Sequence, residues 1–221
     1  IPLCLVGSEM CIRDRSYPNS LLGVIAVIRQ TFLDADWYHK SVQIIEKYPD
    51  QNNPITFHPS LSELAEFQLN RRPILFMTKE EHGALRSLAI ANEFNLSPWL
   101  LGSGYEYRRL DEIAELNPFI VFPLEFPSKP KVKDPFIALQ YSTEQLKHWD
   151  MAPDNIHKVF EKGIRFSFTS ATLKNKKDFR KNIQKIIDRG LPKSVALSAL
   201  TTYPAEAMGL ENILGKIQPG F

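Results

Sequence analysis

The chain has 221 residues, of which 43% are hydrophobic, and 27 Lys and Arg against 25 Asp and Glu give it a formal net charge of +2. This length is enough for one ordinary domain or for a large part of a bigger barrel. The charge is too small to favour nucleic acid or an anionic membrane as a partner, and no apolar run approaches the roughly 20 residues that span a bilayer. We therefore expect neither nucleic-acid binding nor membrane insertion. The oligomeric state stays open.

The first fifteen residues, IPLCLVGSEMCIRDR, lead into no periodic element. A degenerate export signal would carry its basic residues before the apolar stretch, whereas Arg13 and Arg15 follow it. The run from Cys4 to Arg15 resembles a translated sequencing adapter, so we interpret residues 1–15 as an artefact. Both cysteines lie in this segment, which predicts no disulfide, thiolate metal site or cysteine nucleophile in the rest. The true N-terminus is then missing, and a soluble protein of either the cytoplasm or the periplasm is expected.

The next elements, in chain order, are predicted to be two helices. Apolar residues at spacings of three and four predict a helix over residues 20–48. A turn-rich loop over residues 48–54 follows. A capping box of Ser60 and Glu63 then predicts a short helix that ends near Asn70.

From Pro73 onward, short apolar runs alternate with helical patterns. Four runs predict buried strands: residues 73–77, 98–101, 119–122 and 164–168. Helices are expected from about Thr78 to Asn95, from Gly104 to Leu116, from Asp178 to Arg189, over 192–200 and over 204–208, with two short ones starting near Ser142 and Pro153. The fold class is therefore α/β. About four parallel strands alternating with helices indicate an incomplete (β/α)8 TIM barrel.

Functional residues of parallel α/β folds lie just past the carboxyl ends of the strands. Those positions hold Thr78, Ser103, Glu125 and Ser170 here, and no histidine. We take Glu125 as a candidate catalytic residue and Thr78, Ser103 and Ser170 as candidate substrate-binding residues. A complete metal site is not expected, because such a site needs several His and carboxylate ligands together.

The tripeptide Gly102-Ser103-Gly104 follows a strand and precedes a helical pattern, as in phosphate-binding loops. A dinucleotide fingerprint would need a third glycine where Tyr107 stands. A tight turn, with Ser103 and Glu106 as a capping box, is the favoured interpretation.

Glu144 and His148 are four residues apart on a predicted helix of the excursion after the third strand. They are candidate catalytic residues that could approach a substrate together. The alternative is a surface pair beside a buried Trp149. A cluster of basic residues is similarly interpreted as the solvated face of a helix, with phosphate binding as the alternative: Lys174, Lys176, Lys177, Arg180, Lys181 and Lys185.

Several stretches resemble imidazolonepropionase-like members of the amidohydrolase superfamily: residues 17–32, 120–127, 148–155, 199–206 and 214–220. The resemblance covers residues 17–220. It implies that residues 16–213 form the C-terminal half of an amidohydrolase-like TIM barrel and that 214–221 begin the exit to a small β-sandwich.

The resemblance also implies a small-molecule substrate and a hydrolase of C–N bonds in amides or cyclic amides that uses one or two divalent, zinc-like metal ions. The expected ligand positions at the strand ends are occupied by Thr78, Ser103 and Ala171, and the last of these stands where the family has its Asp. No metal ligand is therefore assigned in this part of the chain. A catalytically inactive barrel that serves as a binding or scaffold protein is the alternative, and a phosphate- or sugar-binding protein is a third.

Overall fold

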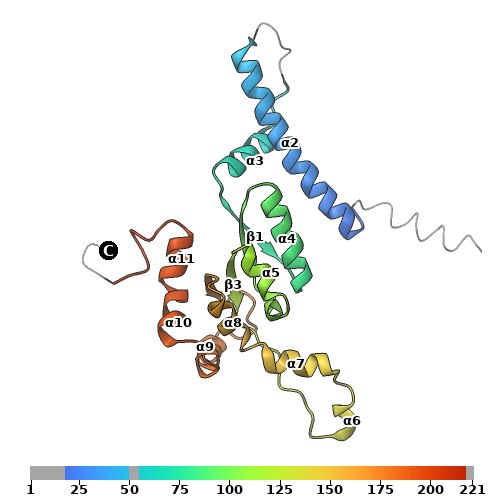
Figure 1. Ribbon diagram of the computed structural model, residues 1–221, viewed down its shortest axis with the longest axis vertical. Helices are drawn as coiled ribbons and strands as arrows, with labels where there is room; N and C mark the ends of the chain where they lie inside the picture. The colour runs from blue at the N-terminus through green and yellow to red at the C-terminus, as the bar shows by residue number, and fades with distance from the viewer. Residues whose placement is uncertain (1–17, 50–54, 218–221) are drawn as a thin grey trace, which may run out of the picture. The chain divides into compact units, whose positions relative to one another are not determined.

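The computed structural model describes residues 18–49 and 55–217 (Figure 1). The chain divides into two compact units, Ile1–Arg72 and Pro73–Phe221. The expected adapter segment, and the last four residues of the expected exit to a β-sandwich, lie outside the described residues. Across the described part of the chain, no helix is both long and apolar enough to cross a membrane.

The described part of the first unit consists of two helices, α2 (Leu21–Lys47) and α3 (Pro59–Leu69), which pack against each other. Helix α2 agrees with the prediction, and the Ser20 hydroxyl caps it by accepting a hydrogen bond from the Gly23 N–H at 3.1 Å. The predicted capping box at Ser60 is wrong. Helix α3 begins at Pro59 instead, since proline fits the first turn of a helix, where no backbone N–H is needed.

The second unit is built on a parallel sheet of four strands in the order β1 (Pro73–Met77), β2 (Ser97–Leu101), β3 (Phe119–Pro123) and β4 (Phe166–Thr169). The first and last residues of each strand lie within three residues of the corresponding ends of its predicted apolar run. The α/β fold class, with parallel strands that alternate with helices as in part of a TIM barrel, is confirmed.

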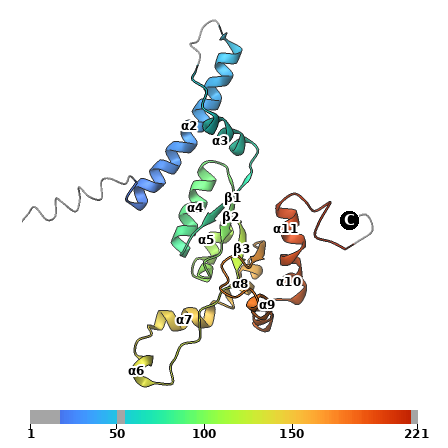
Figure 2. The ribbon, with the colours of Figure 1, turned by 180° about the vertical axis from the view of Figure 1, so that it is seen from behind.

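One face of the sheet carries the core. Phe76, Leu100, Ile120 and Phe166 stand side by side in the strand register, and the last three are almost fully buried. Helices of this unit supply the rest of the core: α4 (Glu81–Glu93), α5 (Leu110–Glu115), α8 (Asn155–Glu161), α9 (Asp178–Asp188), α10 (Lys193–Leu200) and α11 (Thr202–Ala207). Figure 2 shows α11 directly above α10, and both helices contact β4.

The opposite face of the sheet carries Leu75 and Met77 of β1, which are 46% and 75% exposed. Leu101, Val121 and Ser167 follow Met77 across the register. In a closed (β/α)8 barrel, this face of the strands points into the barrel and packs there in layers. The exposure of β1 agrees with a barrel of which the chain forms a part.

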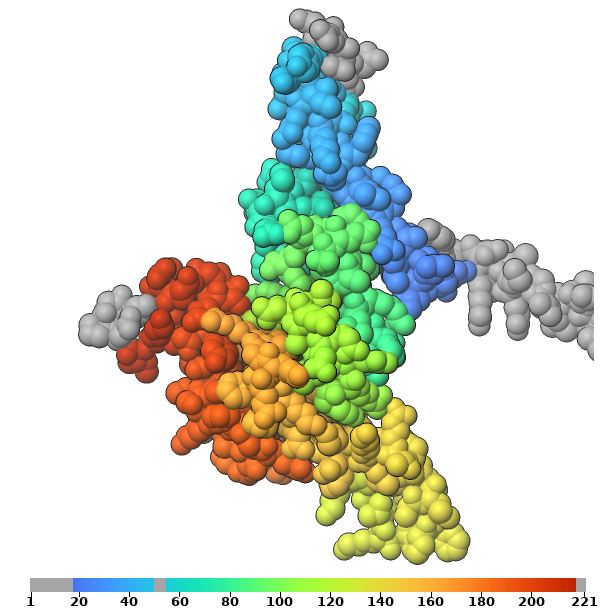
Figure 3. All heavy atoms as spheres, viewed as in Figure 1, coloured from blue at the N-terminus to red at the C-terminus, as the bar shows by residue number. Residues whose placement is uncertain are grey.

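The two edges of the sheet differ. At the amino edge, tight turns lead from each helix into the next strand, and Asn95, Asn117 and Gly163 adopt left-handed backbone with φ of 53°, 41° and 74°. At the carboxyl edge the connections are longer. The largest runs from β3 to α8 and carries α6 (Pro135–Ala138) and α7 (Thr143–Met151), which project from the sheet in both views (Figures 1 and 2) and form a lobe in Figure 3.

Helix starts at the carboxyl edge differ in part from the predictions. Helix α7 begins after Ser142 as expected, with a complete capping box to Gln145. The helix expected from Gly104 to Leu116 is instead a 3-10 turn, η2 (Glu106–Arg108), followed by α5. Helix α4 follows Glu80, whose side chain makes no capping hydrogen bond.

Candidate functional site

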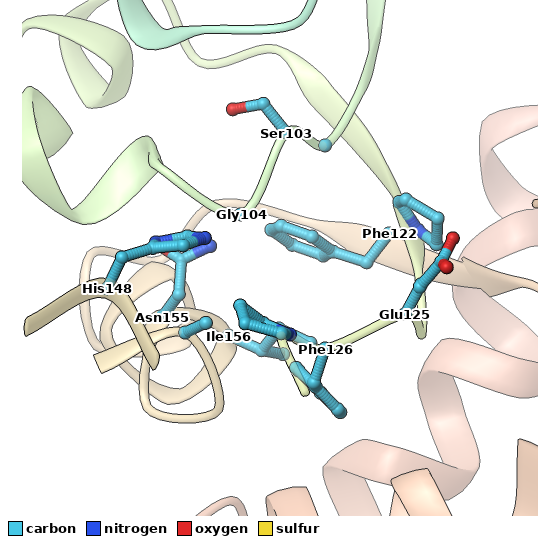
Figure 4. A pocket seen from close by; sticks show the side chains of 12 residues that line it. Ser103, Gly104, Phe122, Glu125, Phe126, His148, Asn155 and Ile156 are labelled. Atoms are coloured by element: carbon cyan, nitrogen blue, oxygen red, sulfur yellow. The ribbon is translucent and has the colours of Figure 1, made fainter. Parts of the chain in front are cut away.

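A hollow of about 40 Å³ lies at the carboxyl edge of β2 and β3 (Figure 4). Gly102, Ser103 and Gly104 line it from the β2 loop, Glu125 and Phe126 from the β3 loop, and His148 from α7. It adjoins a wider groove of about 900 Å³ along α9, with which it shares Glu125, Phe126, Pro127 and His148. The hollow is large enough to hold water, and the groove is large enough for a small molecule.

The loop after β2 is shaped by the buried carboxylate of Glu106, which is 2% exposed. Glu106 accepts hydrogen bonds from the backbone N–H and the hydroxyl of Ser103 at 2.5 and 2.9 Å, and from the Gly104 N–H at 3.0 Å. The side chain of Asn155, from α8, donates a fourth at 2.6 Å. The backbone donors that a phosphate would need are therefore already used by the protein's own carboxylate.

This arrangement corrects the expected capping box. The Ser103 hydroxyl accepts from the N–H of Tyr105 at 3.3 Å, whereas a capping box would direct it to residue 106. The Glu106 carboxylate does reach back to Ser103, so half of the motif is present. Ser103 contributes to the hollow as part of this hydrogen-bonded turn.

The glycines of this loop are required by packing and by backbone conformation. A Cβ at Gly102 would lie 2.4 Å from Cδ1 of Phe122, which is buried at the floor of the hollow. Gly104 has φ +84°, a conformation that side-chain-bearing residues rarely adopt. The close approach of the loop to Phe122 brings the end of β2 to the hollow.

His148 of α7 lies against the aromatic side chains of the β2 loop. Its ring stacks on Tyr105 with a centroid distance of 3.8 Å, and its Nδ1 lies 3.4 Å from the hydroxyl of Tyr107. Burial lowers the pKa of His148 below 6.5, and the positive charge of Arg108 lowers it further. The lowered pKa favours the neutral form of the imidazole. Nε2 is the ring nitrogen that the contact with Tyr107 leaves available.

Arg108 connects α7 to the rest of the unit. It donates to Glu144 at 2.8 Å and to Glu81 of α4 at 3.4 Å, and its guanidinium lies 4.5 Å from the centroid of the Tyr105 ring. In this ion pair the Glu144 side chain is 70% exposed. Arg108 thereby holds α7 in the position that puts His148 beside the hollow.

The three candidate catalytic residues do not all line the same cavity. Glu125 and His148 line the hollow and the groove together. Glu144 lies outside both and shares with His148 a separate depression of about 380 Å³ on α7. Trp149 also lines that depression and is only half-buried, so the buried Trp149 of the alternative interpretation is not found.

Thr78 and Ser170 line neither the hollow nor the groove. Thr78 packs against Gly83 at the start of α4, where a Cβ on the glycine would lie 3.2 Å from the Thr78 Cβ. The backbone carbonyl of Ser170 accepts from the Leu173 N–H at 3.2 Å in a turn after β4. Ala171, in the same turn, is exposed, and its N–H donates to the Thr169 hydroxyl at 3.2 Å.

Three basic residues that the sequence analysis assigned to a solvated helix face line the groove: Lys174, Lys181 and Lys185. Asp178, Lys181, Asn182 and Lys185 follow a spacing of three and four, which places them on one face of α9. That spacing was available in the sequence. The sequence alone does not show that this face of α9 lines a groove together with the loop after β3.

The metal ions implied by the resemblance do not fit the described residues. Nowhere in the described ranges do three or more His, Cys, Asp or Glu side chains come together as metal ligands. The strand ends instead present Thr78, Ser103 and Ala171, and a methyl group coordinates no metal. We therefore derive no catalytic step through a metal ion.

No family model matches this chain, and a search of curated proteins finds no significant match. Among solved structures, an amidohydrolase from Thermotoga maritima MSB8 superposes with a TM-score of 0.71 at 20% sequence identity, over 94% of this chain and 50% of that one. The chain has an amidohydrolase-like fold. It spans about half the length of that structure. A Xaa-Pro dipeptidase with bound methionine gives a TM-score of 0.49 at 17% identity, over 76% of this chain and 42% of that one.

Proposed function

We propose that the chain belongs to a hydrolase that cleaves the C–N bonds of amides or cyclic amides, with the hollow and the adjoining groove as its substrate site. The observation that carries the proposal is that Glu125 and His148 line one hollow at the carboxyl edge of the sheet. Figure 4 shows them on opposite sides of it, with Phe122 and Phe126 between. The amidohydrolase-like fold supports the choice of this edge.

Glu125 is suited to act as the general base. Its side chain is exposed to the groove, and no cation lies within ion-pair distance of it among the described residues. A carboxylate in this position takes a proton from water as the oxygen attacks the carbonyl carbon of the amide. The same proton then passes to the leaving nitrogen as the C–N bond breaks, which restores the carboxylate.

His148 is suited to stabilise the developing negative charge. When the Tyr107 hydroxyl, 3.4 Å from Nδ1, donates to that nitrogen, the neutral imidazole carries its proton on Nε2. That N–H donates to the carbonyl oxygen as it becomes an oxyanion. The stacking on Tyr105 keeps the ring in place and limits access of bulk water.

The resemblance to imidazolonepropionase-like proteins makes cyclic amides the first substrate class to test. The assay follows hydrolysis of hydantoin, 2-pyrrolidinone and N-acetylglycinamide by the full chain. Glu125→Gln keeps the shape of the side chain and removes the base, so kcat should fall by about 100-fold or more. Glu115→Gln is the matched control, because Glu115 lies at the exposed end of α5, away from the hollow. Equal rates for the two variants would contradict the role of Glu125, and no hydrolysis of any amide by the unmodified chain would contradict the function.

A further inference from the structure

We propose that α2 carries a surface for pairing with a second copy of the chain, as an antiparallel pair of α2 helices centred on Leu33. This surface belongs to the first unit, and its role does not depend on the proposed hydrolase function. It consists of an exposed apolar stripe on α2 and of the charged residues beside that stripe.

The stripe runs along most of the length of α2. Its members are all exposed: Leu22 (77%), Ala26, Leu33 (52%), Trp37 (62%) and Ile44 (54%). At 3.6 residues per turn and a rise of 1.5 Å per residue, these five positions fall within an arc of about 60° and extend over about 33 Å. A continuous apolar surface of this length, with an exposed tryptophan in it, is typical of an interaction site.

The opposite side of α2 is already covered. Phe32, Ala35 and Tyr38 are buried on that side, and the Tyr38 hydroxyl accepts a hydrogen bond from the backbone N–H of His58, the N-cap of α3, at 3.2 Å. The ring of Tyr38 also packs edge-on against the His58 ring. Helix α2 therefore has two apolar sides, and the contact with α3 uses only one of them.

The spacing of the stripe makes it complementary to itself. Leu22 and Ile44 stand eleven residues before and eleven residues after Leu33. A two-fold axis at Leu33 therefore packs Leu22 of one chain against Ile44 of the other, and Leu33 meets its own counterpart at the axis. Because an eleven-residue spacing stays on one face of a nearly straight helix, the whole stripe can remain in contact. A two-fold interface requires such a self-complementary patch.

The charges beside the stripe favour the antiparallel direction. Arg29 and Asp36 lie on the same flank of the stripe, four residues before and three residues after Leu33. In a two-fold antiparallel pair, equal flanks face each other and positions before the axis meet positions after it. Arg29 of each chain therefore comes beside Asp36 of its partner, so the interface gains two contacts between opposite charges. The same symmetry brings Arg29 to the level of the partner's Trp37, whose ring can accept a cation.

Cysteine cross-linking of the full chain tests the pairing and its direction together. Cys4 and Cys11 are first replaced by serine, so that each introduced thiol is the only one in the chain. Leu33→Cys should then form a disulfide-linked dimer on mild oxidation, because this position meets its own counterpart at the axis. Leu22→Cys should not cross-link with itself, whereas a mixture of Leu22→Cys and Ile44→Cys should.

Thr31→Cys is the matched control for Leu33→Cys. Thr31 is also exposed and stands two residues away, but it points to a different side of α2. It should remain uncross-linked under the same conditions.

Sedimentation equilibrium of the unmodified full chain over a range of concentrations measures the association itself. We expect a dimer whose dissociation constant rises by about tenfold or more in Leu33→Asp, because that variant places two carboxylates side by side at the axis. Thr31→Asp should leave the dissociation constant unchanged. Circular dichroism of each variant separates loss of pairing from loss of folding.

Each alternative result overturns a stated part of the proposal. A chain that is monomeric at every concentration, or a dimer that Leu33→Asp does not weaken, would overturn the assignment of the stripe to a second copy. Cross-linking of Thr31→Cys as readily as Leu33→Cys would mean that the chains associate without a defined interface. Cross-linking of Leu22→Cys with itself would overturn the antiparallel direction.

Discussion

Asn155 joins the start of α8 to the loop after β2 through a buried amide. Its Nδ2 donates to the Glu106 carboxylate at 2.6 Å, and its Oδ1 accepts from the Tyr107 N–H at 2.8 Å. Asn155 is 1% exposed and Glu106 2% exposed. A buried carboxylate needs such donors, because nothing else replaces the water that it lost. The shape of the candidate site therefore depends on two residues that belong to different connections of the sheet.

Removing this amide should destabilise the unit. Asn155→Ala leaves one lone pair of a buried carboxylate and one backbone N–H without a partner, which costs about 2–4 kcal/mol in the free energy of unfolding. Urea denaturation measures it. Asn92→Ala, at an exposed position of α4, is the control and should change stability by less than about 0.5 kcal/mol. A similar loss for both variants would show that the buried network contributes nothing specific.

Gly102 should not tolerate a side chain. In Gly102→Ala the new methyl group would lie 2.4 Å from the Phe122 ring, so the ring or the loop must move, at a cost of about 1–3 kcal/mol. Phe122→Leu makes room in the same place. The double variant should therefore lose less stability than the sum of the two single variants. Additive losses in thermal or urea unfolding would contradict the contact.

The Arg108 contacts should control the order of α7. Arg108→Ala removes the hydrogen bonds to Glu144 and Glu81 and the contact with the Tyr105 ring, so amide hydrogen exchange in residues 143–151 should accelerate. Glu144→Gln should have a smaller effect, because exposed ion pairs contribute at most about 1 kcal/mol. Unchanged exchange in Arg108→Ala would mean that α7 is held by other contacts.

The His148 pKa predicts how stability changes with pH. Burial and the Arg108 charge lower that pKa below 6.5, while the carboxylates of Glu144 and Glu81 act in the opposite direction. The folded protein then binds the proton more weakly than the unfolded chain does. The contribution of neutral His148 to stability is thus complete above pH 6.5 and is lost as the pH falls through the folded-state pKa.

An NMR titration of the His148 ring should give a midpoint below 6.5. Stability measured from pH 7 downward should fall less steeply in His148→Gln, which has no proton to gain. A midpoint at or above 6.5 would be incompatible with the burial of the ring against Tyr105.

The sheet could be predicted from sequence because its signal is local. The apolar runs at residues 73–77 and 119–122 become β1 and β3 within one residue at each end, since strands of a parallel sheet typically carry continuous hydrophobic residues. The start of α3 was missed because Pro59 determines it, while a serine pattern further on looked equally suitable. The local sequence pattern therefore predicted the wrong N-cap for α3.

The candidate site was predictable only in part. The strand-end rule located Ser103 and Glu125, and both line the hollow. The same rule also selected Thr78 and Ser170. These two residues belong to local turns and do not line the hollow. The role of Glu106 depends on Asn155, 49 residues away, and no local pattern carries that contact.

The central claim is that small amides bind at the carboxyl edge of the sheet, between the β2 loop and Glu125. Backbone amide NMR of the full chain, with hydantoin added to saturation, tests it most directly. The account predicts the largest shift changes at Gly102, Ser103, Gly104, Glu125 and Phe126, which line the hollow. Changes confined to the opposite edge, at turns such as Asn95 and Asn117, or no changes at all, would contradict it.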